Sequence, residues 1–239
     1  MRALIPAAGM ATRLRPLTKH CPKCLLPVGN RTLLERALSA LDENGIRDIT
    51  ICTGYLAEQI REYVSTHFPH LHVNFVHNER YETTNNIYSL YLMRADAEGQ
   101  DVLLLDSDIL FDPSILQRLL QSPDQDTLAL NNHPLGEEEI KVVLGPDKKV
   151  REISKVCSIS EAVGESIGIE KMSAAYTRAL YREMEQMIEK EGLDNIFYER
   201  AFERLIPQGF SFTVTDVTDL RAVELDTPED FQAAAEMFQ

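Results

Sequence analysis

Three basic side chains lie close together near the start of the chain. They are Arg13, Arg15 and Lys23, and they follow the small-residue run Ala7-Ala8-Gly9. A short apolar strand leading into such a run lets backbone N–H groups approach a ligand, and we expect Gly9 to supply a positive φ there. Fixed cations beside exposed amides suit a polyphosphate. The spacing is not the P-loop pattern G-x-x-x-x-G-K-[ST], so on these residues alone a solvated basic turn is equally open.

Acidic residues end two apolar segments in a pattern that suits a hard metal ion. Asp106-Ser107-Asp108 follows the run 102–105, and Glu224-Leu225-Asp226 closes a second apolar segment. Open α/β sheets bind ligands at the carboxyl ends of their strands, and Mg²⁺ takes one or two carboxylates beside water and phosphate oxygens. The second acidic strand end favours a metal site, because one cation needs carboxylates from separate loops. The alternatives are an ordinary acidic strand end and, for Asp226, a helix cap.

Cys21 and Cys24 have the C-x-x-C spacing of redox motifs and of half a zinc site. Cys52 and Cys157 do not supply the second pair that a zinc site needs. Prolines bound the segment that contains Cys24, which disfavours the helix start of a thioredoxin-like motif. We therefore expect reduced thiols without a redox or metal role, and a redox protein is a remote alternative.

The elements that must position these residues alternate between strand and helix in the first half of the chain. The apolar spacing predicts strands over 3–7, 48–52, 72–76 and 102–105, and helices from an N-cap at Thr32 to near Gly45 and over 57–68, 85–94 and 113–120. Repeated strand–helix–strand units predict an α/β fold, a Rossmann-like doubly wound sheet that is mostly parallel.

The second half is less regular. The pattern predicts strands over 141–144, 150–153 and 223–225, helices over 173–190 and 195–206, and a last helix capped by Thr227. No low-complexity linker or repeat interrupts the chain, so we expect a single domain over 1–239 with a small inserted lobe.

Composition narrows the classes of function. The chain has 239 residues, 44% hydrophobic and 26% charged, which is the mix of a soluble globular protein. Its net charge of −14 argues against a broad nucleic-acid-binding face. The sequence contains no apolar run long enough for a membrane span, and the apolar run at residue 1 is too short for a signal peptide, so we expect a cytoplasmic protein. The oligomeric state is open, with a homodimer as one arrangement.

Several of these motifs resemble the nucleotidyltransferases that make nucleotide-activated sugars and alcohols. The resemblance rests on the run from Ala7 to Thr18, on Pro22-Lys23 and on Asp106-Ser107-Asp108. Within that superfamily the chain is most similar to bacterial phosphocholine cytidylyltransferases, through Asn85-Asn86-Ile87-Tyr88-Ser89-Leu90-Tyr91-Leu92 and Glu224-Leu225-Asp226. This resemblance implies a fold of the nucleotide-diphospho-sugar transferase type. The nucleotide-binding part would cover about 1–131 and 221–239, and the acceptor-binding lobe about 132–220.

The resemblance implies a Mg²⁺-dependent transfer of CMP from CTP to phosphocholine or a similar small phosphorylated or phosphonate alcohol, with release of pyrophosphate. Such a reaction depends mainly on positioning and on charge neutralisation. Arg13 would hold the β- and γ-phosphates, and Lys23 the α-phosphate. The implied Mg²⁺ ligands and their support are Asp108, Asp226, Glu224 and Asp106. The chain departs from the family's loop motif at Ala11, where the family has glycine. An alanine at this position implies either a negative φ or a slightly shifted loop.

The resemblance also implies contacts to the two substrates. The implied nucleotide contacts are Ala8, Gly9, Asn86, Ser89 and Asp106. Lys155 resembles a lysine that meets the acceptor phosphate, although an exposed strand-end lysine is equally open. Tyr198 and Glu199 lie where the phosphocholine enzymes place an aromatic and an acid for the acceptor. The chain has no Trp, the best aromatic face for a quaternary ammonium.

Two alternatives remain at this stage. One is a sugar-1-phosphate nucleotidyltransferase that uses UTP, dTTP or CTP. The other is a catalytically silent nucleotide-binding regulatory protein on the same fold, because a fold does not establish an activity.

Overall fold

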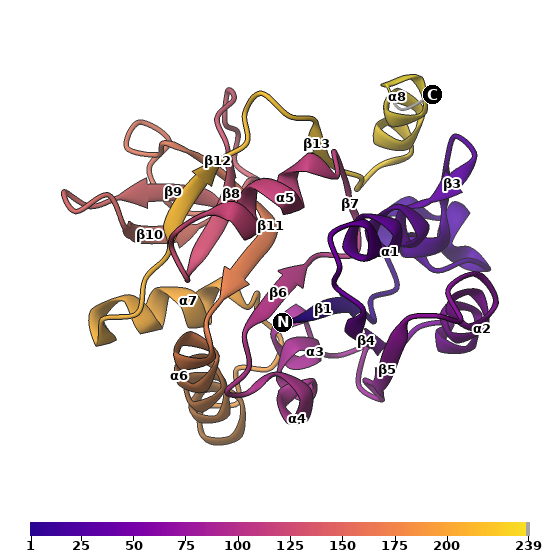
Figure 1. Ribbon diagram of the computed structural model, residues 1–239, viewed down its shortest axis with the longest axis horizontal. Helices are drawn as coiled ribbons and strands as arrows, with labels where there is room; N and C mark the ends of the chain where they lie inside the picture. The colour runs from indigo at the N-terminus through magenta and orange to yellow at the C-terminus, as the bar shows by residue number, and fades with distance from the viewer. Residues whose placement is uncertain (238–239) are drawn as a thin grey trace.

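The computed structural model describes residues 1–237 of the chain (Figure 1). Its strands are β1 (Arg2–Ala7), β2 (Pro27–Val28), β3 (Arg31–Thr32), β4 (Asp48–Thr53), β5 (His72–His77), β6 (Val102–Leu105), β7 (Ile109–Phe111), β8 (Thr127–Asn131), β9 (Lys141–Leu144), β10 (Val150–Ser154), β11 (Gly164–Met172), β12 (Thr213–Asp216) and β13 (Ala222–Glu224). Its α-helices are α1 (Leu33–Glu43), α2 (Ala57–His67), α3 (Asn86–Leu92), α4 (Arg94–Ala97), α5 (Ser114–Gln121), α6 (Ala174–Glu185), α7 (Glu199–Leu205) and α8 (Pro228–Met237). Short 3₁₀ turns occur at Thr12–Leu14, Leu17–Lys19, Lys23–Leu25 and Ile206–Gln208, and a π turn at Gln186–Lys190.

A parallel block of four strands forms one half of the main sheet. The order β6-β1-β4-β5 is parallel throughout, so the chain moves outward from β1 to β5 and then returns to the other side of β1. This reversal opens a crevice beyond the carboxyl ends of β1 and β6, the place where open α/β sheets bind ligands.

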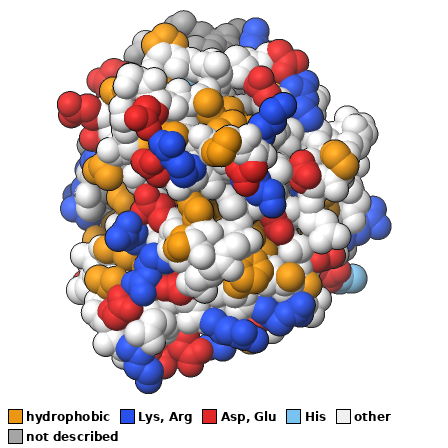
Figure 2. Space-filling view, turned by 90° about the vertical axis from the view of Figure 1, so that its left-hand side faces the viewer, with side chains coloured by type: hydrophobic (Ala, Val, Ile, Leu, Met, Phe, Trp, Pro, Cys, Tyr) orange, Lys and Arg blue, Asp and Glu red, His pale blue; other side chains and the backbone are white. Residues whose placement is uncertain are grey.

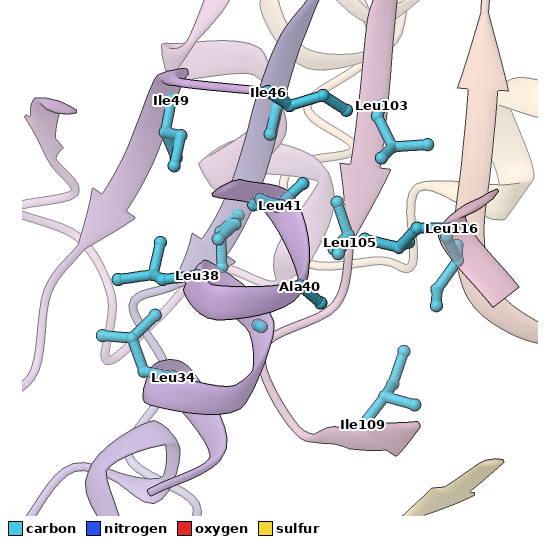
Figure 3. Close-up of a cluster of buried hydrophobic side chains, with 14 of the residues drawn as sticks. Leu34, Leu38, Ala40, Leu41, Ile46, Ile49, Leu103, Leu105, Ile109 and Leu116 are labelled. Carbon is cyan, nitrogen blue, oxygen red and sulfur yellow. The ribbon is translucent and has the colours of Figure 1, made fainter. Parts of the chain in front are cut away.

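Side chains alternate along these strands and build a core on each face. Ala3 and Ile5 of β1 pack with α1, α2 and α5, whereas Leu4 packs with α3, α6 and α7. Figure 3 shows the first of these cores, where Leu38 and Leu41 of α1 lie among the strand side chains. The expected doubly wound α/β architecture is therefore confirmed.

The other half of the sheet is antiparallel except for the parallel pair β8–β12, and it centres on β11, a strand that the sequence pattern did not predict. It pairs with β6, β8 and β9, and so joins the parallel block to the strands at the left of Figure 1. Glu165, Gly168 and Glu170 interrupt its apolar residues, which hides the period-2 signal of a strand. Strands β7, β8 and β12 also went unpredicted, and the helix expected over 195–206 begins only at Glu199.

The outer surface carries both signs of charge. Figure 2 shows Lys and Arg side chains interspersed with Asp and Glu over one face, with no broad basic area on that face. None of the helices within residues 1–237 is long and apolar enough to cross a membrane.

Candidate active site

A cavity of about 370 Å³ opens at the crevice beside β1 and β6. Residues from the β1 loop, α3, the loop after β6, β11, β13 and the start of α7 line it. The expected site residues among its lining are Arg13, Lys23, Lys155, Ala8, Gly9, Asn86, Ser89, Asp106, Asp108, Glu224, Asp226 and Glu199. Tyr198 is not among them.

The loop after β1 differs in detail from the sequence expectation. Gly9 does not take a positive φ; Ala11 does, with φ 45 and ψ 54. The negative φ expected at Ala11 is therefore wrong, and this left-handed conformation costs an alanine about 1–2 kcal/mol. Its carbonyl accepts hydrogen bonds from Leu14 N (3.1 Å) and Thr18 Oγ1 (2.9 Å), which hold the turn. A Cβ on Gly9 would meet no protein atom within 4 Å, so its missing side chain leaves room in the cavity.

Acidic and basic residues converge at one end of the cavity. Asp108, Glu224 and Asp226 each present a carboxylate oxygen, and these oxygens lie within 4.8 Å of one another. The Lys23 ammonium donates to Asp108 Oδ2 at 2.8 Å and to Asp226 Oδ1 at 2.6 Å. Arg13 pairs with the other oxygen of Asp226 at 2.5 Å. An all-oxygen donor set of this kind fits Mg²⁺.

These contacts shift the proton affinities of the cluster. Burial alone lowers the pKa of Lys23, but the Asp108 and Asp226 carboxylates outweigh it and raise the pKa. Burial raises the pKa of Asp226, but Lys23 and Arg13 outweigh it and lower the pKa. Neither Lys23 nor Arg13 makes a hydrogen bond to Glu224. Desolvation by the surrounding protein atoms, together with the charges of Asp108 and Asp226, outweighs the charge of Lys23 and raises the pKa of Glu224 to about 8.

A short antiparallel pair brings the two acidic segments together. β7 follows directly after Asp108 and pairs with β13, so that Glu224 lies opposite Ile109 and Leu225 N donates to the Asp108 carbonyl at 3.1 Å. The cap of α8 uses Asp230 Oδ2, which accepts from the backbone N–H of Asp226 at 2.9 Å. The Asp226 side chain therefore remains available to the cluster, and the cap and metal interpretations are compatible.

The α3 side of the cavity carries the expected nucleoside contacts in a hydrogen-bonded setting. Asn78, which the sequence analysis missed, is buried and donates to Ser89 Oγ at 3.2 Å and to Thr84 Oγ1 at 3.1 Å. Asn86 Oδ1 accepts from Tyr198 N at 2.9 Å and so ties α3 to α7. Asn86 and Ser89, the two nucleotide contacts expected on α3, therefore lie at the cavity wall, where these hydrogen bonds fix their orientation.

The opposite wall comes from β10 and the start of α7. Lys155 Nζ donates to Glu138 Oε2 at 3.1 Å and lies 5.0 Å above the centroid of the Phe197 ring. Glu199 lines the cavity beside them. Tyr198 differs from the expected acceptor contact, because its ring is fully buried behind the wall. Its hydroxyl donates to Asp106 Oδ2 at 2.9 Å, which makes it a support for that carboxylate.

Gly168 is a second residue that the sequence analysis missed. It interrupts β11 with φ 72, and a Cβ there would lie 2.6 Å from Asp106 Oδ2. Its carbonyl accepts from Asp106 N at 2.9 Å. The sequence did contain a feature that indicates Gly168, because an isolated glycine in an apolar strand often marks a bulge or a close approach of the backbone.

The two cysteines of the C-x-x-C segment do not have the lowered pKa of redox thiols. A redox thiol has a lowered pKa, whereas burial raises the pKa of Cys24 to about 12, with a further contribution from Cys21. The C-x-x-C segment forms a 3₁₀ turn at the cavity wall and holds free thiols.

Comparison with known families decides the wider assignment. The model of the MobA-like NTP transferase domain matches residues 3–205. The chain belongs to this family. The structure of this NTP transferase is similar to that of a solved CTP:phosphocholine cytidylyltransferase from Streptococcus pneumoniae, with a TM-score of 0.82, 26% identity and coverage of 100% of this chain and 99% of the other.

Relatives of this NTP transferase include phosphonate-activating and choline-phosphate-activating enzymes. CMP-5'-(3-aminopropyl)phosphonate synthase of Streptomyces rubellomurinus is 27% identical over 98% of this chain and 38% of its own length. Choline-phosphate cytidylyltransferase of Streptococcus pneumoniae is 41% identical over 45% of each chain. The chain therefore spans less than half the length of these first two curated relatives. 2-Aminoethylphosphonate cytidylyltransferase of Lancefieldella rimae is 26% identical over 97% of this chain and 90% of its own.

Proposed function

We propose that this chain is a Mg²⁺-dependent cytidylyltransferase that transfers CMP from CTP to phosphocholine or a similar small phosphorylated or phosphonate acceptor. One observation carries the proposal: Lys23 and Arg13 meet Asp108, Glu224 and Asp226 at one end of a cavity whose other end holds Lys155 and Glu199. The names of the relatives support cytidine as the base and a small cationic phosphate or phosphonate as the acceptor.

The proposed reaction is an in-line phosphoryl-type transfer. A phosphate or phosphonate oxygen of the acceptor forms a bond to the α-phosphorus of CTP. The bond from that phosphorus to the bridging oxygen breaks, and pyrophosphate leaves with the electron pair. Charge neutralisation and alignment provide most of the catalysis in such a step. Arg13 would bind the leaving pyrophosphate, and Lys23 the α-phosphate.

Asp108, Glu224 and Asp226 would hold Mg²⁺, which when bound neutralises phosphate charge and aligns the phosphates. Lys23 contacts two of these three carboxylates, so its ammonium would turn from them toward the α-phosphate as the substrates bind. The Lys155 ammonium, which lies over Phe197, would hold the acceptor phosphate on the opposite side of the reacting phosphorus.

The test is pyrophosphate release with Mg²⁺ across the four NTPs, each paired with phosphocholine, phosphoethanolamine, 2-aminoethylphosphonate and glucose-1-phosphate. We expect turnover with CTP and an amino-alcohol phosphate or phosphonate. Turnover confined to glucose-1-phosphate would instead assign the chain to the sugar-activating enzymes. Absence of turnover with every pair would contradict the proposal.

The Asp108→Asn variant tests the metal cluster. We expect turnover to fall by about 10³-fold or more, because a lost metal ligand removes stabilisation of the transition-state charge. Glu229→Gln is the matched control, an exposed acid three positions after Asp226. Both variants should keep the far-UV circular dichroism of the wild type. Full activity of Asp108→Asn would refute the proposed metal assignment.

A further inference from the structure

A small hydrophobic core lies behind the acidic cluster of Asp108, Glu224 and Asp226. Leu225 stands between two of these acids in the chain, and it is fully buried in this core while both acids line the cavity. The core joins the β1 loop, the segment 26–33, β7, the end of β13 and α8. Its buried members are Leu14, Leu26, Val28, Leu33, Leu110, Leu225, Phe231 and Ala234. The segments that carry the site are therefore packed together from the side that faces away from the cavity.

The first turn of α8 holds the backbone of one acid of this cluster. Asp230 Oδ2 accepts hydrogen bonds from Asp226 N at 2.9 Å and from Thr227 N at 2.7 Å. Thr227 Oγ1 in turn accepts from Asp230 N at 3.2 Å, so Thr227 and Asp230 form a reciprocal helix cap. This cap sets the direction in which the chain leaves Asp226 and places the next residue, Phe231, over the core.

Phe231 is the largest side chain of this core and is 8% exposed. It comes from the last helix, which Figure 1 shows at the edge of the molecule above α1. The core also supports Ala11, whose left-handed backbone packs against it. Such a strained conformation persists only where the surrounding structure holds it. Phe231 thus contributes to the support of the loop that carries Arg13, although it does not itself line the cavity.

We propose that Phe231 and Asp230 of α8 are positioning residues for the metal ion and the triphosphate. They hold the β1 loop against β7 and β13, so that Arg13 and Lys23 meet the acidic cluster. This inference rests on the proposed function and adds the last helix to the parts that it needs. The acceptor wall is anchored in a different core, through Ile153 of β10. We therefore expect α8 to influence binding of the metal nucleotide and to leave binding of the acceptor nearly unchanged.

The first test measures binding of Mn²⁺·CTP by calorimetry, without acceptor, at a temperature where circular dichroism shows every variant folded. In Phe231→Ala we expect the dissociation constant to rise by about 10–100-fold, as for the loss of a residue that orients metal ligands. Phe231→Leu keeps a large apolar side chain and should bind within about fivefold of the wild type. The control is Phe68→Ala, because Phe68 is also 8% exposed but follows α2 in another core; it should bind like the wild type.

A second pair of variants tests α8 without opening a cavity in the core. Asp230→Ala removes the acceptor for two backbone N–H groups, and we expect the dissociation constant of Mn²⁺·CTP to rise by about fivefold or more. Asp230→Asn retains an acceptor oxygen and should stay closer to the wild type. Glu229→Ala, at the exposed neighbouring position, is the control and should match it. In steady-state kinetics KM for CTP should rise in Phe231→Ala and Asp230→Ala, with KM for the acceptor changed less than about twofold.

The outcomes separate this inference from the proposed function. If Phe231→Ala and Asp230→Ala bound Mn²⁺·CTP as tightly as the wild type, the inference would be overturned and the proposed function would stand. Equal weakening by Phe231→Ala and Phe68→Ala, or an equal rise of both KM values, would also overturn it, because a general loss of stability would then explain the effect. A wild-type chain that does not bind Mn²⁺·CTP would contradict the proposed function itself, and this inference with it.

Discussion

Lys23 lies where the two acidic segments meet, and its contacts to Asp108 and Asp226 span 85 and 203 positions of the chain. Its side chain is 11% exposed, while those of the two carboxylates are about a quarter exposed. Removing the ammonium leaves these carboxylates and Glu224 to repel one another. The pair is partly solvated, so the loss is smaller than the 3–5 kcal/mol of a fully buried pair.

We predict that Lys23→Met lowers the free energy of unfolding by about 1–3 kcal/mol in EDTA, and that excess Mg²⁺ restores much of this loss. A divalent ion would replace the missing positive charge among the carboxylates. Melting temperatures in EDTA and in Mg²⁺ measure both effects, with Lys19→Met, an exposed lysine nearby, as the control. If Mg²⁺ stabilised Lys23→Met no more than the wild type, the three carboxylates would not form a metal site.

At the scale of elements, the acceptor wall depends on a buried lysine in β9. Lys141 is 2% exposed, and its ammonium donates to the carbonyl oxygens of Glu137 and Glu139 at 3.2 Å and of Lys155 at 2.6 Å. It therefore fastens the loop that carries Glu138 to the end of β10. These two segments hold the Lys155–Glu138 pair at the cavity.

We predict that Lys141→Met raises KM for the acceptor severalfold while KM for CTP changes little, because three carbonyl groups lose their donor and the wall loosens. Amide hydrogen exchange should quicken over 136–140 and 154–158, and global stability should fall by about 1–3 kcal/mol. Lys149→Met, in the exposed hairpin turn that follows β9, is the matched control. Equal changes in both KM values, or unchanged hydrogen exchange in these two segments, would contradict the proposed role of Lys141 in holding the two segments together.

At the scale of the whole molecule, the buried acids make stability depend on pH. The pKa of Glu170 is raised from 4.5 to about 8, first by burial and then by the charge of Glu199. The folded state thus keeps a proton that the unfolded chain has already released. The contribution of Glu170 to stability is present below about pH 4.5 and is lost as the pH rises toward 8.

We predict that Glu170→Gln removes part of this loss. Between pH 5 and pH 8 the free energy of unfolding of the variant should gain about 1–3 kcal/mol relative to the wild type, because the amide cannot ionise. Urea unfolding at the two pH values measures the change. Glu58→Gln, at a side chain 90% exposed, should show no such gain. If the free energy of unfolding depended on pH in the same way in the wild type and in Glu170→Gln, Glu170 would not be held protonated in the folded state.

The sequence by itself determined the parallel half of the fold and the identity of most of the charged residues that line the cavity. These signals are local: apolar periods place β1, β4, β5 and β6, and acids at strand ends mark Asp108 and Asp226. The motif resemblance pointed to the family that the comparison shows. The boundaries of the acceptor lobe remain a prediction.

Only the tertiary structure decided how these residues meet. The central place of β11, the pairing of β7 with β13 and the burial of Tyr198 all depend on partners distant in the chain. The buried Oε2 of Glu199, which has no hydrogen-bond donor among the described residues, is likewise a product of its surroundings, because its burial arises when α7 packs beside β10. A residue type fixes what a side chain can bond to, but the packing of distant segments decides whether that bond is made.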